Sequence, residues 1–94
     1  MKSDISIALT TYNGAKYLRE QLESIYNQTI LPDEVIACDD CSSDETISIL
    51  DEYKNKFGLK YYVNNVNLGY NKNFEKALSL CSCICIECFI QNVF

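Results

Sequence analysis

The sequence predicts an α/β fold built on a parallel sheet, and two observations carry this prediction. Short apolar runs alternate with stretches whose apolar residues recur at helical spacing, in the order strand, helix, strand, helix, strand, helix. Such alternation is typical of parallel strands joined by right-handed helical crossovers. In addition, a polar cluster follows each of the first two apolar runs, where ligands bind in open α/β sheets. The sequence therefore predicts a ligand pocket at this edge.

The first strand is predicted over residues 5–9 and ends at Thr10. Asn13 follows it and is a favourable helix N-cap, because its side-chain oxygen can accept backbone N–H groups. The apolar residues that recur at helical spacing and predict the first helix are Leu18, Leu22 and Ile25.

A second short strand is predicted over residues 35–38. Ser42 and Glu45 then match a capping box, with Asp44 as a rival N-cap for the next helix. The apolar face predicted for that helix consists of Ile47, Leu50, Tyr53 and Phe57, and Gly58 is expected to end it.

The third repeat of this pattern is a strand over residues 59–63, a polar turn over 64–71 around Gly69, and a helix. The helix is marked by Phe74, Ala77, Leu78 and Cys81. Residues 1–82 thus read as one α/β unit, whereas residues 83–94 form an atypical Cys-rich tail that has the alternation of one more strand. An exposed edge of that composition would favour a homodimer through the C-terminal edge.

Composition excludes several classes of function. The net charge of −5 argues against nucleic acid or an anionic membrane as the main partner. The sequence has no run of about 20 apolar residues and no secretory signal, so no membrane insertion and a cytoplasmic location are expected. It also has no histidine, which removes imidazole as a base or metal ligand.

Four motifs occur in order along the chain: Thr10-Thr11-Tyr12-Asn13, Gln28-Thr29, Asp39 to Thr46, and Asn67-Leu68-Gly69. Together they resemble the N-terminal part of a family-2 glycosyltransferase, over about residues 4–80. The resemblance implies part of the GT-A fold, in which a Rossmann-like nucleotide-binding half is joined to an acceptor-binding half. It also implies transfer of a sugar from a nucleotide-diphosphate donor to a saccharide or lipid-linked acceptor, as in bacterial polysaccharide biosynthesis.

The resemblance further implies a nucleotide-binding set, with a UDP-type donor favoured. Thr10 and Tyr12 would contact the nucleotide, and Asp40 would accept the N–H of a uracil-type ring, as a carboxylate that only accepts is suited to do. Gly69 and Lys72 would lie along the ribose and diphosphate. Other interpretations remain open: Tyr12 as a packing residue within the fold, Lys72 as a solvated charge, and Asp39 as a residue that holds the loop backbone.

No catalytic or metal-binding residue is predicted. Members of the family hold Mg²⁺ or Mn²⁺ with a later acidic motif and use a later carboxylate as base, and neither is visible in this sequence. We therefore hypothesise a truncation or frameshift after about residue 82, which the downstream DNA would test, and we expect no transferase activity from this chain alone.

Two alternatives to the glycosyltransferase interpretation remain. One is a small non-catalytic domain that binds nucleotide or only self-assembles. The other is a zinc module, because Cys38-x-x-Cys41 and Cys85-x-x-Cys88 match a four-thiolate spacing.

Overall fold

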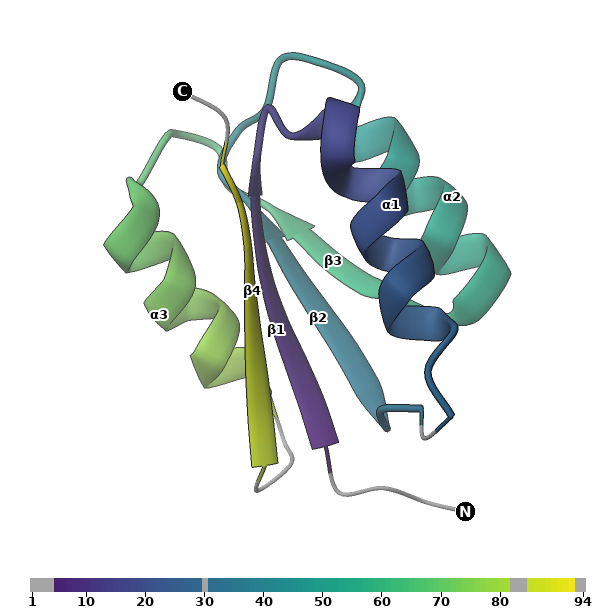
Figure 1. Ribbon diagram of the computed structural model, residues 1–94. Coiled ribbons are helices and arrows are strands. Elements are labelled where there is room, and N and C mark those ends of the chain that lie inside the picture. Colours follow the sequence, from purple (N-terminus) through teal and green to yellow (C-terminus); the bar gives the residue numbers. More distant parts are fainter. Residues whose placement is uncertain (1–4, 30, 82–84, 93–94) are drawn as a thin grey trace.

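Parallel strands form the centre of the protein. The computed structural model describes residues 5–29, 31–81 and 85–92, the last range as backbone only. The strands and helices follow one another as β1 (Ile5–Tyr12), α1 (Ala15–Tyr26), β2 (Glu34–Asp39), α2 (Thr46–Phe57), β3 (Lys60–Val63), α3 (Tyr70–Leu80) and β4 (Cys85–Asn92). The sheet has the order β3-β2-β1-β4 and every pairing is parallel, which confirms the predicted α/β class (Figure 1).

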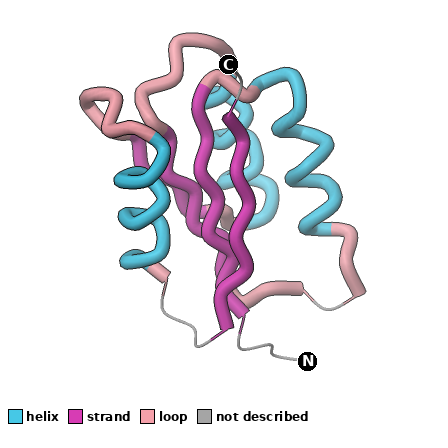
Figure 2. The backbone as a smooth tube through the Cα atoms, turned by 60° about the vertical axis from the view of Figure 1, so that its left-hand side comes forward, coloured by secondary structure: helices cyan, strands magenta, loops and turns pink. Residues whose placement is uncertain are grey.

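The helices cover both faces of this sheet. Helices α1 and α2 lie on one face and α3 lies on the other (Figures 1 and 2). The chain moves in one direction across the sheet from β1 to β3, and then returns past β2 and β1 to β4. Because crossovers keep one hand, reversing the direction moves the connecting helix to the opposite face. The reversal creates a topological switch point between β1 and β4, where ligands bind in such sheets.

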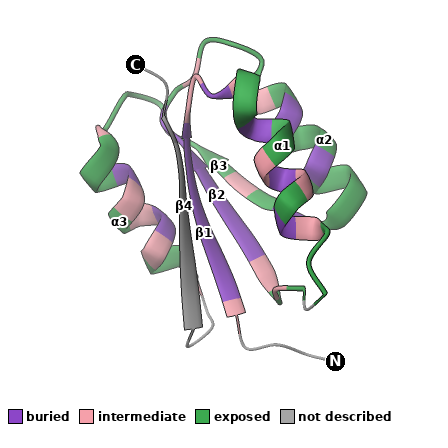
Figure 3. Ribbon diagram, viewed as in Figure 1, coloured by how far each residue is buried: buried purple, intermediate pink, exposed green. Residues whose placement is uncertain are grey.

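The face covered by α1 and α2 carries the main hydrophobic core. Side chains alternate along a strand, so Ile7 and Leu9 of β1 point to this face together with Val35 and Ala37 of β2. Helices α1 and α2 each bury one side against the sheet (Figure 3). In α1 this side is the predicted stripe, whereas in α2 Ile49 is buried and the predicted Ile47 is only partly buried. Their buried residues are Leu18, Leu22 and Ile25 of α1, and Ile49, Leu50 and Tyr53 of α2.

Phe57 departs from this pattern at the end of α2. It was expected on the buried face of the helix, but its side chain is 42% exposed. Its ring stacks on Tyr26 of α1 with centroids 4.3 Å apart, so it packs at the rim of the core. Gly58 ends the helix as predicted, with φ of +80° and its N–H on the carbonyl of Lys54.

Among the side chains that the structure describes, those of β4 not being included, the face covered by α3 has a much smaller apolar cluster. Ala8, Cys38 and Ala77 form it. The other buried residue of α3 is Asn73, a polar side chain that is 2% exposed. Helix α3 also begins at Tyr70, inside the stretch predicted to be a turn. The reason is that Gly69 has φ of +88° and reverses the chain directly before the helix.

The two edges of the sheet are β3 and β4. The Cys-rich segment provides β4, which runs beside β1 from Ile5 opposite Cys85 to Tyr12 opposite Asn92. Self-association through this edge stays a prediction. None of the helices in the described ranges is long and apolar enough to span a bilayer.

Candidate functional site

Three loops meet at the carboxyl ends of the strands. They are residues 13–14 after β1, 40–45 after β2 and 64–69 after β3. The backbone N–H of Asp40 donates to the carbonyl of Thr11 at 2.9 Å, and that of Asn64 donates to the carbonyl of Asp39 at 2.8 Å. The loops therefore continue the strand pairing beyond the sheet, at the upper edge in Figure 1.

Asp39 fixes the start of the second loop. Its side chain is fully buried and accepts three hydrogen bonds, from the hydroxyl of Thr11 at 2.7 Å and from the hydroxyl and backbone N–H of Ser42 at 2.6 and 2.8 Å. These bonds occupy both carboxylate oxygens. Asp39 thus holds the loop backbone, one of the roles that the sequence left open.

The first loop is fastened to the second. The backbone N–H of Asn13 donates to the hydroxyl of Ser42 at 2.8 Å, and the side-chain oxygen of Asn13 accepts the N–H of Ser43 at 2.8 Å. Gly14 likewise donates its N–H to the hydroxyl of Thr46 at 3.0 Å. Together these bonds hold the first two loops as one unit.

These contacts correct two expectations about helix caps. Gly14, not Asn13, is the N-cap of α1, and Asn13 has φ of +48°, a conformation that asparagine tolerates. The capping box is also wrong: Glu45 is the N-cap of α2, and Ser42 bonds to Asp39 and Asn13 instead. In both cases a partner across the loops replaces the local one.

Asp44 joins the N-termini of the two helices on this face. Its carboxylate accepts the N–H of Ala15, the first residue of α1, at 3.2 Å, and the N–H and hydroxyl of Thr46, the first residue of α2. Burial acts to raise the pKa of Asp44, but the hydrogen bonds from Thr46 and Ala15 outweigh it and lower the pKa below its usual value. A negative charge is also favoured at a helix N-terminus.

Asp40 fastens the third loop. Its side chain is 4% exposed. Oδ1 accepts the N–H of Leu68 at 2.7 Å and the amide of Asn64 at 3.0 Å, and Oδ2 accepts the N–H of Gly69 at 3.0 Å. The residue predicted to read a nucleotide base therefore also holds the loop that is predicted to lie along the diphosphate.

The other predicted nucleotide contacts lie around this centre. Thr10 is 1% exposed, and its hydroxyl has no hydrogen-bond partner among the described residues. Tyr12 ends β1 and is half-buried, while Lys72 is exposed in the first turn of α3. At Gly69 an added Cβ would meet nothing within 4 Å, so the positive φ explains the glycine. Of the five predicted nucleotide contacts, Asp40 and Gly69 are joined by a hydrogen bond among the described residues.

Sequence reasoning missed three residues next to Asp40. The amide of Asn64 donates to Asp40 and to Asn73 and accepts from the ammonium of Lys76, at 3.0, 2.9 and 2.6 Å. Asn73 also donates to the carbonyl of Cys38 at 2.8 Å. One available signal was that Asn73 precedes Ala77 by four residues, which places it on the buried face of α3.

Comparisons with known proteins identify the family. Residues 6–86 match Glycosyl transferase family 2. The chain belongs to this family. It is 39% identical over 66 residues to the poly(ribitol-phosphate) beta-N-acetylglucosaminyltransferase TarS of Staphylococcus aureus, which covers 68% of this chain and 12% of TarS. It is 40% identical over 80 residues to the abequosyltransferase RfbV of Salmonella typhimurium, which covers 81% of this chain and 24% of RfbV.

Solved structures agree with this assignment. The crystal structure of S. aureus TarS 1-349 in complex with UDP matches with a TM-score of 0.83 and 34% identity, over 97% of this chain and 27% of that one. The TarS 1-349 complex with UDP-GlcNAc matches with a TM-score of 0.84. The resemblance to the nucleotide-binding half of the GT-A fold is thereby confirmed. The chain spans only 12% and 24% of the two curated relatives.

The described residues do not fit the divalent cation that the glycosyltransferase family implies. Among them, no three cysteines or carboxylates come together in a group able to hold a metal ion. Both oxygens of Asp39 are already bonded to the hydroxyl of Thr11 and to Ser42. Burial also raises the pKa of the Cys38 thiol to about 11, which disfavours the thiolate that zinc would need.

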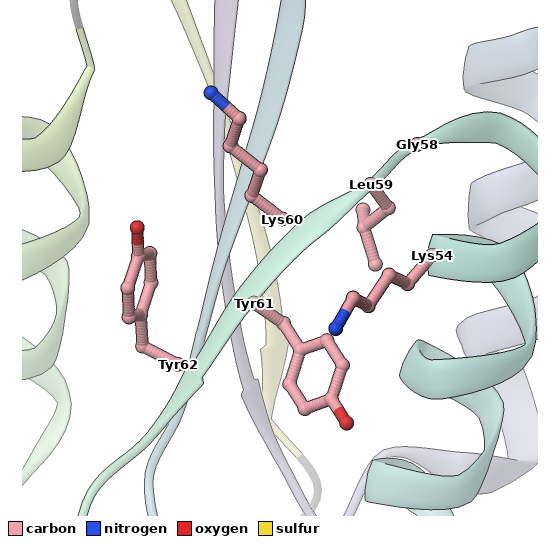
Figure 4. A pocket seen from close by; sticks show the side chains of 6 residues that line it. All are labelled: Lys54, Gly58, Leu59, Lys60, Tyr61 and Tyr62. Carbon is pink, nitrogen blue, oxygen red and sulfur yellow. The ribbon is translucent and has the colours of Figure 1, made fainter.

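A separate hollow of about 360 Å³ lies along β3, lined by Lys54, Gly58, Leu59, Lys60, Tyr61 and Tyr62. Figure 4 shows that Leu59 and Tyr61 point toward α2, whereas Tyr62 and Lys60 point to the opposite side of the strand. The hollow therefore wraps around an edge strand near its amino end. Ligands of parallel sheets bind at the carboxyl ends, so we assign it no part in the nucleotide site.

Proposed function

We propose that this chain binds the nucleoside diphosphate part of a nucleotide-sugar donor, with uridine as the favoured nucleoside. The chain would supply the donor-binding part of an enzyme that passes a sugar to a saccharide or lipid-linked acceptor. The observation that carries the proposal is the position of Asp40, buried at the carboxyl edge of the sheet and bonded to the loop before α3. The complexes of TarS with UDP and with UDP-GlcNAc support it.

The chemistry of Asp40 favours uracil over cytosine. Uracil carries an N–H at ring position 3, whereas cytosine has a lone pair there. A carboxylate only accepts hydrogen bonds, so it pairs with the uracil group and repels the cytosine group. Oδ1 already accepts two hydrogen bonds and Oδ2 accepts one, which leaves Oδ2 with capacity for the base.

The remaining predicted contacts complete the proposed site. Tyr12 lies at the end of β1, beside the switch point, where its ring can stack on a base. The hydroxyl of Thr10 is buried and has no hydrogen-bond partner among the described residues, and the proposal pairs it with a polar group of the ligand. The proposal places Gly69 and Lys72, at the start of α3, along the ribose and diphosphate, where an ammonium offsets phosphate charge.

The proposal assigns no catalytic residue to this chain, because the described carboxylates at the site are engaged in holding loops. We expect no sugar transfer by the 94-residue chain alone. We also propose a cytoplasmic location, which the free thiols of Cys38 and Cys41 support because thiols stay reduced there.

Calorimetric titration of the purified chain with UDP and with CDP tests the proposal. We expect UDP to bind more tightly than CDP, since only uracil offers an N–H to Asp40. Loss of a hydrogen bond to a charged group costs about 1.5–3 kcal/mol, so Asp40→Ala should weaken UDP binding about 10- to 100-fold. Glu20→Ala, which removes an exposed carboxylate from α1, is the control and is expected to bind UDP as the wild type does.

Equal affinities for UDP and CDP in the wild-type chain would contradict the role of Asp40. No binding of either nucleotide would contradict the proposal as a whole. The wild-type comparison keeps the test valid even if Asp40→Ala loosens the loop that Asp40 holds. A melting curve of each variant separates loss of binding from loss of folding.

A further inference from the structure

We infer that Asn64 is a positioning residue for Asp40, held in place by Lys76 and Asn73, and that this buried chain of hydrogen bonds sets the preference of the site for uridine. The inference rests on the proposed function. It adds the first residue after β3 and two residues of the buried side of α3 to the predicted contacts.

The side-chain amide of Asn64 forms hydrogen bonds with three partners. Nδ2 donates to Oδ1 of Asp40 at 3.0 Å and to Oδ1 of Asn73 at 2.9 Å, while its own Oδ1 accepts from Nζ of Lys76 at 2.6 Å. Asn64 is 4% exposed and Asn73 is 2% exposed. Polar groups buried this deeply are costly unless all are paired, so this arrangement is strongly specified.

The partners fix the orientation of the amide. Lys76 can only donate a hydrogen bond and the Asp40 carboxylate can only accept one, so Asn64 must turn its oxygen to Lys76 and its nitrogen to Asp40. Asn73 adds a second anchor, because its own nitrogen donates to the carbonyl of Cys38 in β2 at 2.8 Å. The chain of bonds thus runs from α3 through the end of β3 back to β2.

This orientation determines which oxygen of Asp40 is available. Asn64 and the N–H of Leu68 both bond to Oδ1, so that oxygen is saturated and the carboxylate plane is fixed. Oδ2 accepts from no other described residue than Gly69, which leaves it for a ligand N–H. Without Asn64 the carboxylate would be held only by the N–H groups of Leu68 and Gly69, one on each oxygen, and Oδ1 would lose one of its two hydrogen bonds. We expect the discrimination between a base N–H and a base lone pair to weaken as the position of the carboxylate becomes less fixed.

Lys76 supplies the charge that this buried carboxylate needs. A carboxylate removed from water is stable only when it is hydrogen-bonded and compensated. Asn64 links Lys76 to Asp40 through a single amide, so the cation acts on the carboxylate without contacting it. We therefore expect Lys76 to have a smaller effect on specificity than Asn64, but one in the same direction.

The ratio of the CDP to the UDP dissociation constant tests the inference. We expect Asn64→Leu to lower this ratio about 5- to 10-fold, the equivalent of one hydrogen bond, and Lys76→Met to lower it less. Lys76→Arg keeps the positive charge and the donor and should restore most of the ratio. Asn55→Leu and Lys54→Met, on the exposed side of α2, are matched controls that should leave the ratio unchanged.

The ratio distinguishes positioning from a merely structural role, because a loss of folded protein lowers the apparent affinity for both nucleotides equally. An unchanged ratio in Asn64→Leu and Lys76→Met would overturn the inference while leaving the proposed function standing. A wild-type chain with no preference for UDP would overturn both. If Asn64→Leu does not fold, the milder variants Lys76→Met and Lys76→Arg test the inference through the same ratio.

Discussion

The two faces of the sheet bury different kinds of side chain. On the side of α1 and α2, the strands bury Ile7, Leu9 and Val35 against long apolar side chains of the helices. On the side of α3, the apolar cluster among the described side chains consists of small residues around Ala77, and buried polar side chains bond to one another toward the carboxyl edge. Asp40, Asn64 and Asn73 are each 4% exposed or less.

This difference separates stability from recognition. Burial of large apolar side chains is non-directional and stabilises the fold whichever ligand is bound. Hydrogen bonds among buried polar groups are directional, so they fix individual atoms, and here they fix the carboxylate of Asp40. We expect substitutions on the first face to change the free energy of unfolding, and substitutions on the second to change binding as well.

The largest effect is expected from Leu22→Ala on α1. Leu22 is fully buried in the main core, and such truncations cost about 2–5 kcal/mol of stability. Urea unfolding measures this loss, and Glu20→Ala on the exposed side of the same helix is the control. The fraction that remains folded should bind UDP with wild-type affinity. A further drop in that affinity would break the proposed separation of the two faces.

A smaller loss of stability, with a loss of binding, is expected from Asn73→Leu on α3. The substitution leaves the carbonyl of Cys38 and one N–H of Asn64 without their partner, which costs about 1–3 kcal/mol. UDP affinity should fall by more than the folded fraction explains. Asn71→Leu, at an exposed position of the same helix, serves as the comparison in unfolding and titration. Unchanged affinity in folded Asn73→Leu would contradict a role for this face in recognition.

The smallest effect is expected from Asp44→Asn, where the loops join the two helices of the apolar face. Hydrogen bonds from Thr46 and Ala15 lower the pKa of Asp44, so its stabilising contribution is present above the usual value near 3.8 and is lost as pH falls through the lowered pKa. At pH 7 the substitution should cost about 1 kcal/mol, because a side chain that accepts the N–H groups at a helix N-terminus contributes about this much. Unfolding curves of both proteins should converge below pH 4, and a constant difference down to pH 2 would contradict this contribution.

The apolar pattern was sufficient to predict most of the fold. Leu18, Leu22 and Ile25 recur at helical spacing and are all buried, and Gly58 ends α2 as expected. Such signals lie within a short stretch of sequence, so they can be recognised before the fold is known. The start of α3 was misplaced because the positive φ of Gly69 brings the helix forward to Tyr70.

The hydrogen bonds of the site were harder to predict because their partners are distant in sequence. Asn13 and Ser42 are residue types that are favoured as helix caps. Instead, they join the first two loops through hydrogen bonds between residues 29 and 30 positions apart in the sequence. The bond from Asn73 to Cys38 spans 35 positions. The propensity of a residue type for helix caps or turns describes only its local preference. Which loops meet depends on the order of the strands in the sheet.

The most direct test of the account is a titration of the ¹⁵N-labelled chain with UDP, in which NMR records the amide signal of each residue. We predict shifts at the carboxyl edge, foremost the N–H groups of Leu68 and Gly69 that bond to Asp40, and little change in the core of α1 and α2. Shifts confined to the hollow at Lys54 to Tyr62, with none at Leu68 and Gly69, would contradict it.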